Sequence, residues 1–217
     1  MDSKRRTGNK TPTPHAKKHK EDMDSKRHIG KTTLTETLEK KLGAARYYTP
    51  PHHIAHLRKY FDSLPELVRR AYYCLGNYIV AVEISKECRD RPVIMDRFWH
   101  STTAYGITNE SSDSDLPPPG HRVYRWPSDL VQPTLILFLT VSEEIRKQRI
   151  QNRGGEKTHE EKVMEKDQLF RKRLCEAYRR MHDPAPIELD SSGSVESVVK
   201  NAVLILQQYH IQLDRAP

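Results

Sequence analysis

Apolar residues recur every three or four positions in several stretches of the chain, which is the spacing of one face of a helix. Leucines follow this spacing over residues 34–42, and a longer stretch covers residues 64–82. Ser63 and Glu66 have the spacing of a capping box, which predicts where the longer helix begins. The same pattern predicts further helices over residues 54–61, 142–153, 160–181 and 195–208.

Short runs of apolar or aromatic residues lie between these helices, and each is typical of a strand in a parallel sheet. They cover residues 47–49, 92–95, 134–139 and 186–189. Strands that alternate with helices predict an α/β fold, in which helices flank both faces of a mostly parallel sheet as a three-layer sandwich. Residues 111–128 contain three consecutive prolines and several charges, so we expect a long surface loop there.

The first helix opens on Gly30-Lys31-Thr32-Thr33, which matches the second half of a P-loop. In a P-loop the backbone N–H groups at the helix N-terminus bind phosphate, the lysine reaches the β- and γ-phosphates, and the hydroxyl binds Mg²⁺. We therefore expect these four residues to bind ATP, and Thr32 to ligate Mg²⁺ as well. The first strand of a P-loop NTPase fold is missing, because Ser25 stands at its glycine position and residues 10–27 contain no strand-like run.

The apolar run 92–95 ends at Asp96 and Arg97, and ligands of parallel sheets lie beyond the carboxyl ends of the strands. An acidic residue in this place can bind the magnesium of a P-loop directly or through water, so we expect Asp96 to be a metal ligand. An arginine beside it can bind a phosphate through two hydrogen bonds. The alternatives are a turn or helix cap for Asp96 and a surface ion pair for Arg97.

A second group of cations follows the strongest predicted strand. Arg149 and Arg153 lie four residues apart on one helix face and precede Gly154-Gly155. Two guanidinium groups before a flexible loop predict a lid over about residues 149–160 that closes on a triphosphate. The alternative is a solvated basic helix.

The long helix carries the candidates for substrate binding. Tyr73 and Asn77 lie one turn apart, and an aromatic ring with an amide can stack on a pyrimidine and read its edge. Arg69 and Arg70 sit on the same helix, and we expect all four residues to bind substrate. The alternative is a core tyrosine with surface arginines.

Positive charge is concentrated at the N-terminus. The chain of 217 residues has a formal net charge of +8, and residues 1–27 hold nine Lys or Arg against four Asp or Glu. This segment has almost no large apolar residues, so we expect a disordered basic tail over residues 1–27 and a folded domain over residues 28–217. A nucleic-acid-binding or targeting arm is the alternative, but a solvated tail with no nucleic-acid partner is favoured.

The N-terminal segment also contains a repeat, because Met1–Arg5 recur identically as Met23–Arg27. Chance repetition of five residues is improbable in so short a chain. A local duplication, or a gene model joined to the wrong upstream exon, explains both the repeat and the missing strand.

Cysteine content and hydropathy indicate the compartment. The three cysteines are odd in number and widely separated, which predicts a reduced, intracellular protein. No apolar run approaches the length that spans a bilayer, so we expect a soluble protein with no membrane partner.

Four segments together resemble the thymidylate kinase-like nucleoside monophosphate kinases, and most of all their mitochondrial UMP-CMP kinase branch. They cover residues 30–33, 69–78, 96–101 and 133–141, and the similarity extends over about residues 30–208. The resemblance implies a P-loop kinase fold. It also implies transfer of the γ-phosphoryl group of ATP, with Mg²⁺, to a pyrimidine nucleoside monophosphate: UMP, CMP, dUMP, dCMP or dTMP.

The resemblance also implies roles for single residues. Lys31 and Thr32 would hold ATP phosphates and Mg²⁺, Arg97 the acceptor phosphate, and Tyr73 would face the base. Arg149 and Arg153 would belong to the lid. Together with Lys31, Asp96 and Arg97, these two arginines form the expected catalytic set.

Two departures from the family bear on specificity and activity. Thymidylate kinases proper have an arginine where this chain has Asn77, which favours UMP and CMP over strict thymidylate specificity. Ser25 and Arg27 replace a glycine and an acid of the P-loop, so the alternative is a catalytically impaired nucleotide-binding relic or an incomplete gene product. The resemblance implies a mitochondrial location, with the cytoplasm as the alternative, and leaves a homodimer open.

Overall fold

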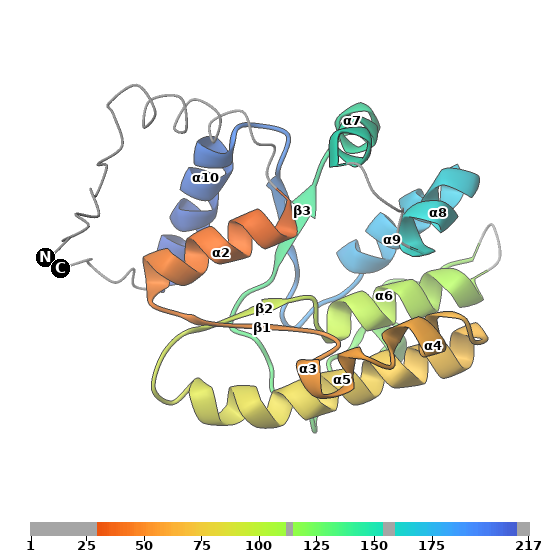
Figure 1. The fold of residues 1–217 in the computed structure, drawn as a ribbon, viewed down its shortest axis with the longest axis horizontal. Coiled ribbons are helices and arrows are strands. Elements are labelled where there is room, and N and C mark those ends of the chain that lie inside the picture. The colour runs from red at the N-terminus through yellow and green to blue at the C-terminus, as the bar shows by residue number, and fades with distance from the viewer. Residues whose placement is uncertain (1–29, 112–114, 154–158, 212–217) are drawn as a thin grey trace, which may run out of the picture.

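The structure, a computed structural model, describes residues 30–111, 115–153 and 159–211 and confirms the expected α/β fold (Figure 1). The first half contains α2 (Lys31–Leu42), β1 (Ala45–Tyr48), α3 (His52–Ala55), α4 (Arg58–Asp62), α5 (Glu66–Glu87), β2 (Val93–Asp96) and α6 (Trp99–Glu110). The second half contains the short 3₁₀-helix η1 (Arg122–Tyr124), β3 (Leu137–Thr140), α7 (Glu143–Arg153), α8 (His159–Lys166), α9 (Gln168–Arg179), β4 (Ile187–Asp190) and α10 (Val195–Gln208). The expected tail over residues 1–27 lies outside the described residues.

The four strands in the described part of the chain form two parallel pairs. β1 pairs with β2, with Ala45 opposite Val93, and β3 pairs with β4, with Leu137 opposite Ile187. The parallel direction is therefore as predicted. The prediction of one sheet is not met, because no backbone hydrogen bonds join the two pairs within the described part of the chain.

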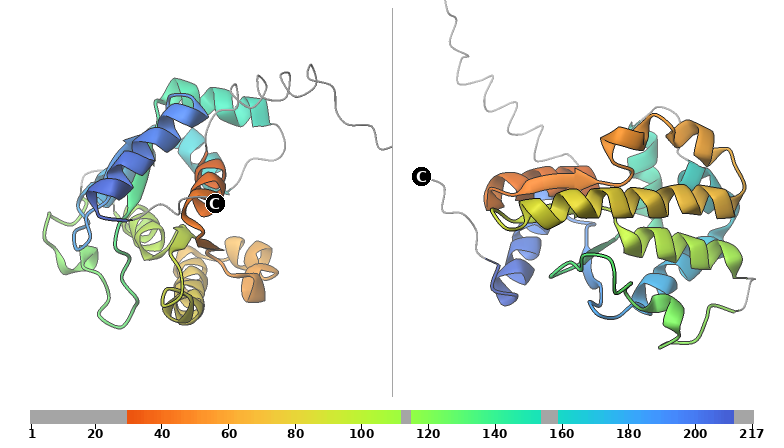
Figure 2. Two further views of the ribbon diagram at one scale, coloured as in Figure 1. Left: turned by 90° about the vertical axis from the view of Figure 1, so that its left-hand side faces the viewer. Right: turned by 90° about the horizontal axis from the view of Figure 1, so that it is seen from below.

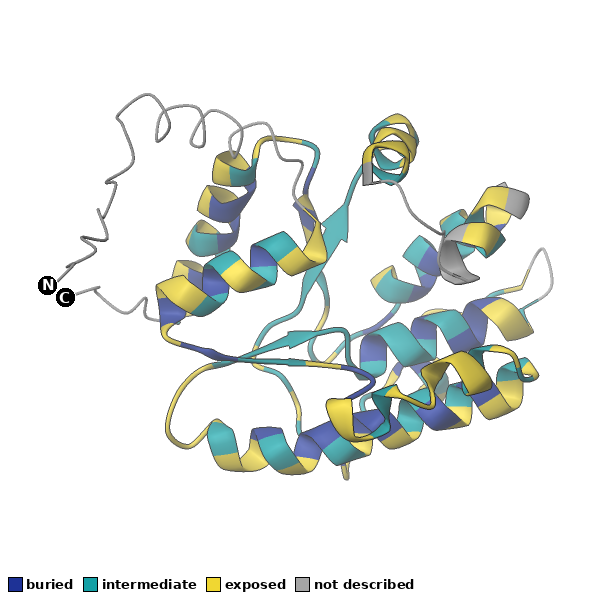
Figure 3. Cartoon of the chain, viewed as in Figure 1, coloured by how far each residue is buried: buried dark blue, intermediate teal, exposed yellow. Residues whose placement is uncertain are grey.

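One apolar core nevertheless connects the two strand pairs. Leu34, Leu38 and Leu42 of α2 are buried and pack with Ile94 of β2 and Leu139 of β3. The core is completed by α10, whose Val198 and Val199 face it, and by Leu189 of β4. Buried and exposed positions alternate along α2 and α10 at helical spacing (Figure 3), as the leucine pattern predicts.

Helices cover both faces of the β1–β2 pair. In Figure 1, α2 lies on one side of these strands and α5 on the other, and both helices contact β1. The views of Figure 2 show α5 and α6 running side by side, and α6 packs in turn on α9. This layering places the start of α6 next to the end of β2.

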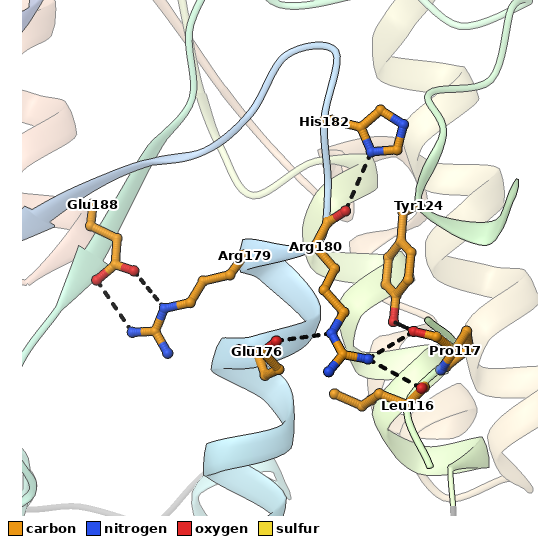
Figure 4. Close-up of polar contacts among 8 residues, drawn as sticks. All are labelled: Leu116, Pro117, Tyr124, Glu176, Arg179, Arg180, His182 and Glu188. Carbon is orange, nitrogen blue, oxygen red and sulfur yellow. Dashed lines mark hydrogen bonds and ion pairs between the residues drawn. The ribbon is translucent and has the colours of Figure 1, made fainter. Parts of the chain in front are cut away.

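The segment predicted as a surface loop is anchored in the interior. Tyr124 is completely buried in a second core cluster between α6 and α9, and its hydroxyl donates to the carbonyl oxygen of Pro117 at 2.8 Å. Arg180 donates to the carbonyl oxygens of Leu116 and Pro117 at 3.1 and 2.8 Å (Figure 4). The surface-loop prediction is therefore wrong for Tyr124, because a proline-rich backbone can be held by side-chain donors.

Two predicted helix boundaries are also wrong. Pro65 is the N-cap of α5 without a side-chain cap, Ser63 donates instead to the Tyr60 carbonyl oxygen, and Glu66 accepts from Arg69. The single helix predicted over residues 160–181 is divided at Asp167 into α8 and α9. The Asp167 carboxylate accepts from the backbone N–H of Phe170 at 2.9 Å and so caps a new helix.

His100 is a buried histidine in an aromatic environment. Its side chain is only 5% exposed, its ring lies 5.0 Å from that of Trp126, and its Nε2 atom has no hydrogen-bond partner among the described residues. Burial lowers its pKa to about 4, and a hydrogen bond to the backbone of Pro184 opposes this shift. The folded protein therefore keeps His100 neutral at pH values where the unfolded chain takes up a proton.

We expect His100 to make the protein less stable as the pH falls from about 6.5 to about 4. Below pH 6.5 the unfolded state binds the extra proton first, so the free energy of unfolding decreases until the folded pKa is reached. The shift corresponds to about 3 kcal/mol at pH 4 relative to pH 7. Urea unfolding at both pH values measures it in the wild type and in His100→Asn, which lacks the titrating ring.

His56, an exposed histidine, provides the control, because His56→Gln should keep the full pH dependence. If His100→Asn loses as much stability on acidification as the wild type, His100 is not the group responsible.

Candidate nucleotide-binding site

A broad cleft opens where the first turn of α2 meets the carboxyl ends of β2 and β3. Residues 30–33, Asp96 and Thr140 line this space, which we call the main cleft. The Lys31 and Thr32 side chains are exposed to solvent. The first backbone N–H groups of a helix have no acceptor within the helix, so this turn is suited to bind an anion.

The main cleft is strongly cationic. Among the described residues that line it, nine are Lys or Arg and three are Asp or Glu. Such an imbalance attracts a polyanion. Lys31, Arg97 and Arg149 were predicted from the sequence; the other cations are Arg58, Arg146, Lys147, Arg171, Lys172 and Arg179.

These additional cations come mainly from α7 and α9. Arg171 and Arg179 lie eight residues apart, with Cys175 between them, and all three line the main cleft from one face of α9. Sequence reasoning missed them because basic residues at helical spacing are also usual on a solvated helix face. Only the position of α9 beside the strand ends distinguishes the two.

Glu143 at the start of α7 is held by two arginines. It accepts from Arg146 at 2.6 and 2.9 Å, and Arg171 lies 3.1 Å away. The hydrogen bonds from Arg146 are the main cause that lowers the pKa of this carboxyl group, and the charge of Arg171 adds to the effect. The contact joins α7 to α9 across one end of the main cleft.

The structure describes part of the predicted lid. Arg149 donates from Nη2 to the carbonyl oxygen of Ser191 at 2.5 Å, and burial lowers the pKa of its guanidinium group. Arg153 is the last residue of α7, but its side chain lies outside the described part of the chain, as do residues 154–158. Arg149 thus lines the cleft as predicted, while its role as a lid residue stays a prediction.

A smaller pocket adjoins the main cleft, and its empty space is about 460 Å³ when the open solvent at its mouth is included. We call it the side pocket. It combines three arginines, three aromatic rings and three serine or threonine side chains, with one carboxylate. The lining residues are Thr49, Glu66, Arg69, Arg70, Tyr73, Arg97, Phe98, Ser101, Thr102 and Tyr105.

Arg97 lies at the junction of the two spaces. Together with Tyr105, it lines both the main cleft and the side pocket. Its backbone has a φ of 67°, in the left-handed region, which costs a non-glycine residue about 1–2 kcal/mol. Its guanidinium carbon lies 5.8 Å from the centre of the Tyr105 ring. A strained, cationic residue between two cavities is typical of a functional site.

Arg69 and Arg70 line the side pocket from α5, and each is held by a carboxylate. Arg69 is 7% exposed and donates from Nε to Glu66 at 2.9 Å, whereas Arg70 pairs with Glu110 at 2.5 Å. Gly106 leaves room for Arg70, because a Cβ atom there would lie 2.7 Å from Arg70 Cδ. Both guanidinium groups are therefore fixed in position.

Tyr73 lines the same pocket, and its hydroxyl donates to Asp62 at 2.9 Å. The structure thus brings together four of the predicted substrate residues: Arg69, Arg70, Tyr73 and Arg97.

Asn77 does not line the side pocket. Its side chain is 1% exposed and lies behind Thr49 and Thr102, two residues that do line it. The amide accepts from Thr49 Oγ1 at 3.2 Å and donates to Thr102 Oγ1 at 3.1 Å. In this structure Asn77 therefore reaches the pocket only through these two hydroxyl groups.

Sequence reasoning missed the contribution of α6, which supplies Ser101, Thr102 and Tyr105. Their spacing of three and four residues is a helical signal, but polar residues at that spacing do not show which side faces a pocket. The Ser101 hydroxyl shares a hydrogen bond of 2.8 Å with Tyr178, whose burial raises its pKa to about 12.

A model of the thymidylate kinase family matches residues 28–202. The chain belongs to the thymidylate kinase family. This confirms the resemblance found in the sequence motifs. No helix within the described residues is long and apolar enough to cross a membrane.

The proteins similar to this thymidylate kinase family member include a human protein and a fungal enzyme. The human protein named "UMP-CMP kinase 2, mitochondrial" is 48% identical over 180 residues, which cover 82% of this chain and 40% of that protein. The chain therefore spans less than half the length of this relative. A solved structure of thymidylate kinase from Candida albicans covers 86% of this chain and 90% of its own, with a TM-score of 0.64 and 18% identity. This structural similarity supports the α/β fold of the chain.

Proposed function

We propose that this domain transfers the γ-phosphoryl group of ATP to a pyrimidine nucleoside monophosphate such as UMP or CMP, or one of their deoxy forms. The observation that carries the proposal is the position of Arg97, which lines both the cationic main cleft and the aromatic side pocket. A residue in this place can contact a donor phosphate and an acceptor phosphate at once. The human relative's name supports the choice of pyrimidine acceptors.

In this proposal the main cleft holds ATP. The backbone N–H groups at Gly30–Thr33 bind phosphate oxygens, and the Lys31 ammonium group neutralises phosphate charge. Arg149 and Arg153 add positive charge around the phosphates as the lid over residues 149–160 closes.

The Thr32 hydroxyl and the Asp96 carboxylate are the groups that would hold Mg²⁺. Both line the main cleft, and both offer the hard oxygen ligands that Mg²⁺ prefers. No group of three or more His, Cys, Asp or Glu among the described residues could hold a metal, but Mg²⁺ at phosphates is usually bound through one or two protein oxygens. The donor set therefore fits, and the ion would supply charge neutralisation at the phosphates.

The side pocket receives the nucleoside monophosphate. Arg69, Arg70 and Arg97 provide cationic donors for its phosphate, and Tyr73 and Tyr105 provide aromatic surface for its base. The reaction then needs no covalent intermediate, because positioning of the two phosphates and neutralisation of their charge lower the barrier.

An assay of ADP release over a panel of nucleoside monophosphates tests this proposal. We expect UMP, CMP, dUMP or dCMP to give the highest kcat/KM, and purine monophosphates to be poor acceptors. A purine acceptor that exceeds every pyrimidine would contradict the choice of substrate class. Nucleotide binding without turnover of any acceptor would indicate a nucleotide-binding protein that has lost kinase activity.

We also propose a mitochondrial location, in line with the name of the human relative. Imaging of the tagged full-length protein in cells tests this, and a diffuse cytoplasmic signal would contradict it.

We propose a homodimer as well, formed through an exposed apolar stripe on α5. Leu67, Ala71, Leu75, Tyr78 and Val82 are all exposed and follow one another at intervals of four, four, three and four residues. Such spacing is typical of a helix that packs against another helix, and a two-fold axis would place the same stripe opposite itself.

Light scattering during size-exclusion chromatography measures the oligomeric state. We expect a dimer for the wild type and a monomer for Leu75→Glu/Val82→Glu, because burying two carboxylates per chain opposes association. Leu204→Glu, at an equally exposed position on α10, should remain dimeric. A monomeric wild type would contradict the proposal.

A further inference from the structure

Two threonines and one asparagine form a hydrogen-bonded chain behind the wall of the side pocket. Thr49 follows β1, Asn77 lies in the middle of α5, and Thr102 lies in the first turn of α6. Gly76 makes the close approach possible, because a Cβ atom there would lie 3.2 Å from both Thr49 Cγ2 and Pro51 Cδ. The chain therefore connects three separate elements at one point of the pocket wall.

The amide of Asn77 determines where each hydroxyl proton points. The Thr49 hydroxyl is nearly buried, so its proton needs an acceptor within the protein, and Asn77 Oδ1 lies 3.2 Å away. This leaves Asn77 Nδ2, which can only donate, opposite Thr102 Oγ1 at 3.1 Å. The Thr102 oxygen accepts from Asn77, and its own proton remains available for another partner.

Thr102 is the member of the chain that can use this proton in the pocket. Its side chain is half-buried and lines the side pocket, and its hydroxyl donates to no other described residue. The neighbouring Ser101 hydroxyl shares its hydrogen bond with the Tyr178 hydroxyl, where either oxygen can be the donor. The Thr102 hydroxyl therefore lines the pocket beside the aromatic side chains of Tyr73, Phe98 and Tyr105 with its proton available.

We propose that Asn77 is a positioning residue that aims the Thr102 hydroxyl at the base of the acceptor nucleotide, where Thr102 donates a hydrogen bond. This inference rests on the proposed function. Uracil offers the acceptors O2 and O4, and cytosine offers O2 and N3. One hydroxyl donor can therefore serve both bases, which suits a site that accepts either pyrimidine.

Binding of CMP, measured by calorimetry and compared with binding of ribose 5-phosphate, tests the role of Thr102. The second ligand has the sugar and the phosphate but no base. We expect Thr102→Val to weaken CMP binding about tenfold and to leave ribose 5-phosphate binding unchanged, because the substitution removes one polar contact to the base. Thr102→Ser keeps the hydroxyl and should bind CMP like the wild type.

Asn77→Asp tests the positioning role. A carboxylate can only accept, so it takes the Thr102 proton away from the pocket while Thr102 itself is unchanged. We expect this variant to show the same loss of CMP binding as Thr102→Val. Adding Thr102→Val to Asn77→Asp should then cost less than about twofold, because the donor is already lost. If the buried carboxylate of Asn77→Asp lowers the melting temperature too far, Asn77→Leu is used instead. Leucine makes no hydrogen bond to Thr102, so the Thr102 hydroxyl can turn to a carbonyl oxygen of its own helix.

The outcomes separate this inference from the proposed function. A wild-type chain that binds neither CMP nor ribose 5-phosphate overturns both. If the wild type binds and phosphorylates CMP but Thr102→Val binds it equally well, only the role of Thr102 is overturned. If Thr102→Val costs the same tenfold in the wild type and in Asn77→Asp, Asn77 has a structural role only.

Discussion

Replacing Lys31 by alanine is expected to lower kcat about a thousandfold with the best pyrimidine monophosphate. The ammonium group lies at the first turn of α2 in the main cleft, where phosphate charge would shift during transfer. An interaction that strengthens in the transition state acts on kcat more than on KM. The Lys31 side chain is exposed, so the fold should remain intact.

Lys40→Ala provides a matched control, because Lys40 is an exposed lysine in the last turn of the same helix. Its kcat should equal that of the wild type, and the melting temperatures of both variants should stay close to the wild-type value. A Lys31→Ala protein with near-normal kcat would show that α2 does not hold the transferred phosphate.

The second large effect is expected at Arg97. Arg97→Lys should lower kcat/KM for the acceptor about a hundredfold, because an ammonium group cannot form the paired hydrogen bonds that a guanidinium group offers to phosphate. The positive charge is kept, so the loss would report geometry rather than charge. The KM for ATP should change much less, since the main cleft has other cations near the donor phosphates.

Arg122→Lys, an exposed arginine in η1, serves as the control and should have wild-type kinetics. Steady-state kinetics with each substrate varied in turn gives kcat/KM for the acceptor and KM for ATP separately. A loss for ATP that exceeds the loss for the acceptor would place Arg97 at the donor phosphates instead. An Arg97→Lys enzyme with the wild-type kcat/KM for the acceptor would contradict the role of Arg97 on which the proposed function depends.

Periodicity predicted the parts of the fold whose burial follows one face. The leucines of α2 are buried as their spacing predicts, and so are Val198, Val199, Ala202 and Leu206 of α10, because these positions share the helix face that packs on the core. The helix predicted over residues 142–153 is also present as α7, and Ser142 accepts from the backbone N–H of Ile145 at 3.3 Å at its start. Local signals of this kind depend on few distant contacts.

The errors occur where a distant contact outweighs the local signal. Tyr124 lies in a proline-rich segment, yet Arg180 at the C-cap of α9 holds that segment against the core. Asp167 interrupts a continuous helical pattern because its carboxylate finds a backbone N–H group to cap. The residues that flank Tyr124 in the sequence do not identify Arg180 as the group that holds its segment. The residues that flank Asp167 likewise do not show that its carboxylate will cap a helix.

The candidate site shows the same division. Lys31, Asp96 and Arg97 were predicted because they end a strand or begin a helix, and such positions in an α/β fold meet at one edge. Thr49 and Thr102 were not predicted, because a threonine in a turn or a helix carries no signal of its own. Their significance depends on Asn77, which connects them across three elements.

Transfer of a radioactive γ-phosphate from ATP to CMP is the most direct test of the proposed kinase activity. The purified chain, incubated with labelled ATP, Mg²⁺ and CMP, should form labelled CDP that chromatography separates from ATP. The label should be absent from CDP without Mg²⁺ and strongly reduced in Lys31→Ala. Label that appears only in inorganic phosphate, or remains entirely in ATP, with CMP and with every other pyrimidine monophosphate would contradict the proposed function.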